Sequence, residues 1–114
     1  MGLNSDIIGF GFFSKEIVKH LEYAEVVYEG VPEGSVIVAH IIACETTPQS
    51  TELANALGFE PWDFTKHRFE AQLVLEHAEQ LKLLPYHFPD HKDAICDLIA
   101  LAEAGFSFLF LVNG

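Results

Sequence analysis

Residues 35–45 (SVIVAHIIACE) constrain the fold of this chain most, because apolar side chains occupy both of their alternating faces. One face would carry Val36, Val38, His40, Ile42 and Cys44, and the other Ile37, Ala39, Ile41 and Ala43. A strand that is apolar on both sides is usually central in its sheet and covered on both of them. The segment therefore predicts a central strand with helices packed against both faces of a sheet.

Two further segments near the ends of the sequence have the composition of strands. Residues 6–13 (DIIGFGFF) and residues 106–112 (FSFLFLV) are short, apolar and rich in phenylalanine. Apolar runs of this length are too short to cross a membrane as helices. Together with residues 35–45, they predict a sheet of about three strands.

Capping residues and a helical spacing of apolar residues predict about four helices between these strands. The predicted helices begin at Ser14, at Thr47, at Asp63 or Thr65, and at Asp90, and the last three end near Gly58, Leu84 and Gly105. Ala24 and Tyr28 belong to the apolar stripe of the first helix, although residues 26–28 are equally consistent with a strand.

The predicted order of elements, β-α-β-α-α-α-β, favours one small domain over residues 1–114. Its class would be α/β or α+β, with the helices packed on the sheet. If the first two strands are parallel neighbours, the connection between them should be right-handed.

The apolar segment at residues 106–112 also predicts association. A sheet of about three strands has two edges, and this segment contains no charge or proline that would prevent pairing with another chain. A second copy commonly covers such an edge. We therefore expect a homodimer or a heteromeric complex, with a strand buried inside the sheet as the alternative.

Acidic residues outnumber basic residues by seventeen to six, which gives a formal net charge of -11. Nucleic-acid binding depends largely on lysine and arginine at phosphates, and an anionic membrane repels an acidic protein. We expect neither as a partner and expect a basic protein surface instead. Both cysteines lie in apolar runs and no signal-peptide pattern is present, so we expect a cytoplasmic location.

Many of the acidic residues lie between Lys19 and Lys66, a stretch without any other lysine or arginine. Trp62 is flanked there by Glu60 and Asp63 and would suit an aromatic anchor at an interface. The predicted partner-binding residues are Glu29, Glu33, Glu60, Trp62 and Asp63. They favour a non-enzymatic protein-binding module, of inhibitor, immunity or adaptor type, that docks a basic partner. The alternative is a face that is acidic only for solubility.

A small enzyme or a nucleotide- or ligand-binding domain is the alternative function, and the Gly9–Ser14 turn (GFGFFS) is one basis for it. Gly9 and Gly11 would lie between a strand and a helix, and Glu29 follows about 20 residues later, where a dinucleotide site holds the ribose. Ser14 stands where the third glycine belongs, and three phenylalanines crowd the turn. A strand whose glycines admit a close neighbour is the simpler interpretation.

Cys44 is the other basis for an enzyme. It would lie near the carboxyl end of the central strand, just before the helix at Thr47, where open α/β sheets bind ligands. A helix N-terminus stabilises a thiolate, whereas the neighbouring Glu45 opposes it. The alternative is a small side chain in the core.

His67 and Glu70 are the candidate metal ligands, because they would be neighbours on one face of the third predicted helix. His77 would lie about 10 Å from Glu70 along that helix, too far to share the ion. The spacing matches no strong zinc pattern, and a solvated His67 is the alternative. We expect no cofactor, and of the two functions we prefer the non-enzymatic one.

Overall fold

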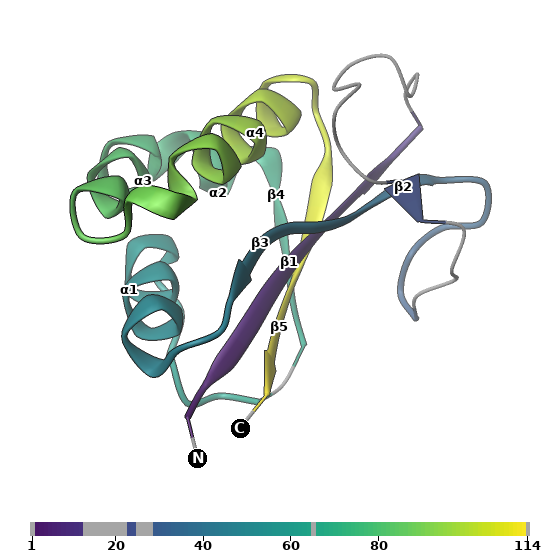
Figure 1. The fold of residues 1–114 in the computed structure, drawn as a ribbon. Coiled ribbons are helices and arrows are strands. Elements are labelled where there is room, and N and C mark those ends of the chain that lie inside the picture. Colours follow the sequence, from purple (N-terminus) through teal and green to yellow (C-terminus); the bar gives the residue numbers. More distant parts are fainter. Residues whose placement is uncertain (1, 13–22, 25–28, 65, 114) are drawn as a thin grey trace.

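Five strands form one antiparallel sheet in the computed structural model, which describes residues 2–12, 23–24, 29–64 and 66–113 (Figure 1). The strands are β1 (Asn4–Gly11), β2 (Tyr23–Ala24), β3 (Val36–Cys44), β4 (His67–Glu70) and β5 (Ser107–Asn113). Their order across the sheet is β2-β3-β1-β5-β4, so the three predicted strands are all internal.

The helices of the described residues gather on one side of the sheet (Figure 1). They are α1 (Thr47–Leu57), α2 (Ala71–Glu76), α3 (Ala78–Leu83) and α4 (Lys92–Glu103). Two 3₁₀ turns, η1 (Leu84–Tyr86) and η2 (Pro89–His91), connect α3 to α4. Each turn contains a proline, which lacks the amide hydrogen that a continuous helix needs.

Helix α1 shows how local sequence sets the limits of an element. The Thr46 side chain accepts a backbone N–H of the first turn, Pro48 follows within that turn, and Gly58 ends the helix at φ 84. The helix predicted from Thr47 to Gly58 is confirmed, but its cap is Thr46. The Thr47 hydroxyl instead accepts the Leu3 N–H at 2.9 Å, which ties α1 to the start of β1.

The main core lies between these helices and the sheet. Phe108 and Phe110 of β5 are fully buried there. Phe108 stacks on Phe69 of β4 at 5.2 Å between ring centroids, and Phe110 stacks on Phe59 at 5.5 Å. Rings at this spacing stabilise the fold beyond the burial of their area alone.

The opposite face of the sheet carries a smaller buried cluster, formed by Ile8, Phe10, Ile37 and Leu109. Val31, which precedes β3, packs against it, and no residue of α1–α4 belongs to it. For the described residues, the prediction of helices on both faces is therefore wrong. An antiparallel sheet commonly places its helices on one face only.

The structure is a single α+β domain, as the sequence predicts, and its long strands match the predicted ones. β1, β3 and β5 correspond to residues 6–13, 35–45 and 106–112. β1 pairs with β3 in the antiparallel sense, so the conditional expectation of a right-handed parallel crossover does not apply. None of the helices in the described residues is long and apolar enough to span a membrane.

Strand β5 lies inside the sheet, hydrogen-bonded to β1 on one side and to β4 on the other. The prediction that it forms an open edge is therefore wrong. The short strand β4, which covers β5, was not predicted. As an edge strand, β4 is itself protected by the charged side chains of Arg68 and Glu70.

The helix predicted from Asp63 or Thr65 to Leu84 is wrong in its first turns. Residues 67–70 form β4, and α2 begins only at Ala71. Phe69 is 3 % exposed and faces the core, whereas Arg68 and Glu70 are exposed, which is the alternation of a half-buried strand. His77 separates α2 from α3, so the remaining part is two short helices.

The first predicted helix is only partly testable. Ala24 lies in β2, where it pairs with Ile37 of β3, so its assignment to a helical stripe is wrong. Residues 13–22 and 25–28, and with them Ser14 and Tyr28, lie outside the described residues.

Candidate functional site

The loop between α1 and β4 exposes two aromatic side chains beside carboxylates. The Asp63 N–H donates to the Glu60 carbonyl at 3.2 Å and closes a turn with a proline and Trp62 at its centre. Proline in the first central position presets the backbone of such a turn. Trp62 and Phe64 are each 54 % exposed, and their rings meet edge to face at 6.4 Å. We call residues 60–64 the aromatic loop.

The base of the aromatic loop is anchored to β4. The Asp63 carboxylate lies 3.3 Å from Nε2 of His67, and the His67 ring stacks on Phe59 at 5.0 Å. Glu60 remains exposed. The aromatic loop therefore brings together three of the predicted partner-binding residues, Glu60, Trp62 and Asp63, on an ordered base.

Glu29 and Glu33 lie in a different loop. They belong to residues 29–35, which lead into β3 and turn at Gly30 and Gly34, with φ 88 and φ 86. Both glutamates are exposed. In Figure 1 this segment lies beside β2, whereas the aromatic loop crosses near the two ends of the chain. The five predicted residues thus occupy two separate loops.

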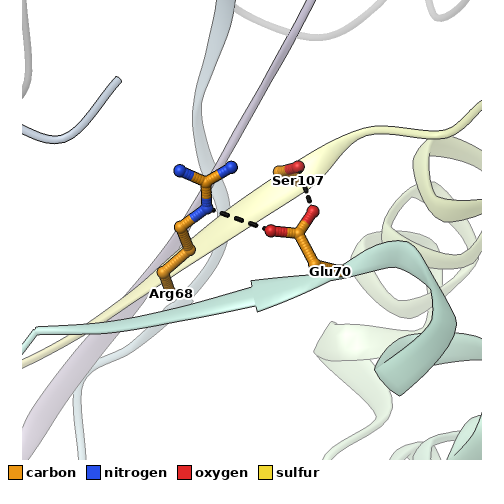
Figure 2. Close-up of polar contacts among 3 residues, drawn as sticks. All are labelled: Arg68, Glu70 and Ser107. Carbon is orange, nitrogen blue, oxygen red and sulfur yellow. Dashed lines mark hydrogen bonds and ion pairs between the residues drawn. The ribbon is translucent and has the colours of Figure 1, made fainter. Parts of the chain in front are cut away.

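A polar cluster on the outer face of β4 and β5 was not predicted from the sequence. Arg68 Nε donates to Glu70 Oε1 at 3.0 Å, and the Ser107 hydroxyl donates to the other oxygen of Glu70 (Figure 2). The Ser107 hydrogen bond, followed by the nearby Arg68 charge, lowers the pKa of Glu70 below its ordinary value of 4.5. Glu70 therefore stays a carboxylate that orients Arg68.

Two hollows lie on this outer face, and Arg68 lines both of them. One, of about 370 Å³, is also lined by Glu29, Gly30, Lys66 and Leu109. The other, of about 320 Å³, is lined by Phe10, Gly11, Phe12, Pro32, Gly105 and Ser107 as well. Residues from the 29–35 segment border both hollows, so this segment and Arg68 of β4 flank a candidate small-molecule site that is open to solvent.

A larger hollow, of about 450 Å³, lies between η1 and α4. Its lining residues are Lys82, Pro85, Tyr86, Lys92, Ile95 and Cys96. The Tyr86 ring is 81 % exposed, so it borders this hollow without filling it.

The structure contradicts the geometry expected of a dinucleotide site. Gly9 lies inside β1 and Gly11 is its last residue, and β1 pairs with β3 in the antiparallel sense, whereas a dinucleotide fold pairs such strands in parallel. A Cβ at Gly9 would lie 2.9 Å from the terminal methyl of Ile41, so this glycine admits a close neighbour inside the sheet. Ser14 lies outside the described residues, and Glu29 belongs to an exposed segment that follows β2.

Cys44 lacks the properties of a nucleophile. Its side chain is 1 % exposed, and burial raises the pKa of its thiol to about 11, with the nearby Asp6 charge adding to the effect. It lines none of the three hollows described above. The alternative of a buried core cysteine describes it correctly.

His67 and Glu70 do not face one another as the metal hypothesis requires. They lie on a strand, and three residues apart on a strand means opposite faces of the sheet. His67 stacks on Phe59 on the face of the sheet that carries the main core, whereas Glu70 contacts Ser107 on the outer face. Among the described residues, no group of three histidine, cysteine or acidic side chains is arranged to hold a metal ion.

Two signals in the sequence point to the features that were missed. The alternation in Lys66–Glu70 (KHRFE) of charged residues with His67 and Phe69 is the pattern of an edge strand. The scarcity of basic residues in this chain makes the pair Lys66 and Arg68 conspicuous. Comparison of this chain with protein-family models, with curated proteins and with solved structures finds no match.

Proposed function

We propose that this protein is a non-enzymatic binding module that docks a basic protein segment through its aromatic loop. The observation that carries the proposal is the exposed pair Trp62 and Phe64, held edge to face at 6.4 Å on a closed turn. Large aromatic side chains that are already ordered lose little conformational freedom on binding, and they are enriched among the residues that dominate interface energies.

Charge complementarity supports a basic partner. The aromatic pair is flanked by the carboxylates of Glu60 and Asp63, and the whole chain has a formal net charge of -11. Such a field accelerates encounter with a cationic surface, and it weakens as salt is added. Glu29 and Glu33, although in another loop, contribute to the same field. An inhibitor, an immunity-type protein or an adaptor would use a surface of this kind.

A heteromeric complex follows directly from this function, whereas the homodimer loses its original basis because β5 is internal. Light scattering coupled to size exclusion tests the homodimer, and a mass near 12.7 kDa at micromolar concentration would contradict it. A cytoplasmic location is part of the proposal and is supported by two cysteines that are both free thiols.

The only tryptophan of the chain lies in the proposed interface, so its fluorescence reports binding there. We would titrate the protein with two dye-labelled peptides without aromatic residues, decalysine and an alternating lysine–leucine decamer. Dye anisotropy measures binding anywhere, and Trp62 emission measures contact with the aromatic loop. The proposal expects the lysine–leucine peptide to bind more tightly and to shift Trp62 emission.

Matched variants separate local contact from total charge. Glu60→Gln and Glu103→Gln change the net charge equally, but Glu103 lies at the end of α4, away from the aromatic loop (Figure 1). We expect E60Q to weaken binding several-fold more than E103Q. Phe64→Ala should weaken binding of the lysine–leucine peptide more than binding of decalysine. Equal effects of E60Q and E103Q, or an unchanged Trp62 emission at saturation, would overturn the proposal.

A further inference from the structure

The basic residues that the structure describes lie beside hollows in the surface. Of six in the sequence, the structure describes Lys66, Arg68, Lys82 and Lys92, and each of these lines a hollow. Acidic side chains are abundant enough to pair with all of them. In the described part of the chain, however, only Arg68 forms an ion pair with a carboxylate, through its Nε atom.

The guanidinium of Arg68 is held in place while its terminal nitrogens stay open. Glu70 accepts from Nε, and the ring of Phe10 lies under the guanidinium at 5.1 Å from its centroid. Neither terminal nitrogen has a hydrogen-bond partner among the described residues, and Figure 2 shows both directed away from Glu70. This is the fork of two parallel donors that binds a carboxylate or a phosphate.

The support behind Arg68 is itself ordered. Ser107 donates to the Glu70 oxygen that Arg68 does not use, so the carboxylate has both of its oxygens engaged. Glu70 lies across from Ser107 in the register of β4 and β5, which fixes the separation of their side chains. An arginine whose orientation is set in advance loses less conformational entropy when it binds an anion.

The surroundings of Arg68 provide a second charge and an apolar wall. Lys66 lies two residues before Arg68, just ahead of β4, and lines the hollow of about 370 Å³ together with it. On the other side, Phe12 is 68 % exposed and borders the hollow of about 320 Å³ together with Pro32. Neither hollow is large, so the fitting ligand is a small molecule.

We propose that Arg68 and Lys66 bind the carboxylate or phosphate of a small organic anion whose apolar part packs against Phe12. Glu29 lines the hollow beside Lys66 and opposes this charge. Glu29 therefore limits the affinity for an anion, and removing its charge should strengthen binding. The site lies outside the aromatic loop, and it stands or falls independently of the proposed docking function.

The test is an NMR titration of the isotope-labelled protein with benzoate, phenyl phosphate, inorganic phosphate and benzyl alcohol. We expect benzoate or phenyl phosphate to shift the signals of Arg68 and Leu109, and the tighter of the two identifies the anionic group. Inorganic phosphate should bind more weakly because it lacks the ring, and neutral benzyl alcohol more weakly because it lacks the charge. Failure of both ring-bearing anions to shift these signals at millimolar concentration would overturn the proposal.

Five variants locate the site. Arg68→Lys keeps the charge but loses the fork, and we expect roughly a tenfold or larger loss of affinity. Lys66→Gln should weaken binding more than Lys92→Gln, which removes the same charge from the hollow beside α4. Glu29→Gln should tighten binding more than Glu33→Gln, which lies in the same segment but lines neither hollow.

Further variants and controls distinguish a loss of anion binding from a loss of folding and from the proposed docking function of the aromatic loop. Ser107→Ala leaves the net charge unchanged and should weaken the anion by loosening Glu70, while Trp62→Ala should leave anion binding unaltered. Backbone NMR spectra of each variant verify that it is folded. Equal affinity of R68K and the unaltered protein, or equal losses in K66Q and K92Q, would mean that the anion is attracted only by general charge.

Discussion

The Nδ1 atom of His40 lies 2.5 Å from Oδ2 of Asp6, across an irregular stretch of the β1–β3 pair. Ile7 pairs with Ile42 and Gly9 pairs with Val38, so a single residue of β1 faces three residues of β3. This bulge places His40 at φ 53, the left-handed conformation that residues with a side chain rarely adopt. The contact with Asp6 fixes the side chain of a strained residue.

Two substitutions of His40 distinguish the cost of its left-handed backbone from the value of its contact with Asp6. Both His40→Ala and His40→Gly remove the contact with Asp6, but only glycine adopts the left-handed conformation without a steric penalty of roughly 1–2 kcal/mol. Part of the stability that glycine gains by avoiding this penalty is offset by its greater conformational freedom in the unfolded chain, roughly 0.5–1 kcal/mol. We expect H40G to be more stable than H40A by about 0.5–1 kcal/mol in urea unfolding. An H40A protein as stable as H40G would show that the bulge relaxes.

The hydrogen bond from Ser107, more than the charge of Arg68, should set the titration of Glu70. We expect Ser107→Ala and Arg68→Gln each to raise the pKa of Glu70 toward 4.5 when the carboxyl carbon is followed by NMR, since the first removes a hydrogen bond and the second removes a hydrogen bond and a charge. Because the pKa of Glu70 is lowered in the folded state, its contribution to stability is present above pH 4.5 and is lost as the pH falls through the lowered value. The stability difference between the unaltered protein and Glu70→Gln should therefore shrink as the solution is acidified. An unchanged pKa of Glu70 in S107A would contradict the assigned cause.

The two cysteines should differ in reactivity by their location. Cys96 is exposed, whereas Cys44 is buried with the pKa of its thiol raised to about 11. At neutral pH we expect one thiol to react rapidly with a disulfide reagent and the second only on unfolding, as followed by mass spectrometry. Cys96→Ser should abolish the rapid phase and Cys44→Ser should leave it intact. A rapid phase that persists in C96S would mean that the strand end near Cys44 opens readily.

Replacing phenylalanine with alanine should lower the free energy of unfolding far more in the core than in the aromatic loop. Phe108 is fully buried in β5, and Phe108→Ala should lower the free energy of unfolding by about 3–5 kcal/mol. Phe64 is 54 % exposed, and Phe64→Ala should change it by less than about 0.5 kcal/mol. Denaturant unfolding of both variants at a constant m value makes the comparison. A costly F64A would assign the aromatic loop to the fold instead of to a partner.

Sequence patterns predicted the elements whose apolar residues are continuous. Residues 35–45 and 106–112 contain enough adjacent apolar side chains to identify β3 and β5. The segment from Thr47 to Gly58 has a residue typical of a helix start at one end and a residue typical of a helix end at the other. β4 was missed because residues 67–70 are only four long and precede a helical stripe, which extended the predicted helix backwards. A short strand is specified by its pairing with β5, and that pairing is not visible in its own sequence.

The candidate sites divide in the same way. Trp62 with its acidic neighbours is a local pattern, and the structure finds its aromatic ring exposed. Arg68, Glu70 and Ser107 come from two strands far apart in the sequence, so their cluster depends on the register of β4 and β5. The hypotheses at Gly9 and at His67 failed because each assumed a backbone arrangement. The first required parallel strands, whereas β1 and β3 are antiparallel, and the second required a helix where β4 is a strand.

The pairing of β1 with β5 has a consequence for the order of folding. Asn4 pairs with Asn113, so two internal strands of the sheet come from opposite ends of the described chain. Closing so long a loop costs entropy before any strand contact compensates for it, which places this sheet among the slower folding topologies. Until residues 107–113 are in place, β1 lacks its neighbour on one side and β4 lacks the strand with which it pairs in the sheet. A fragment that ends at Phe106 therefore leaves one edge of the apolar strand β1, and all of β4, without hydrogen-bond partners, and both are then open to pairing with other molecules.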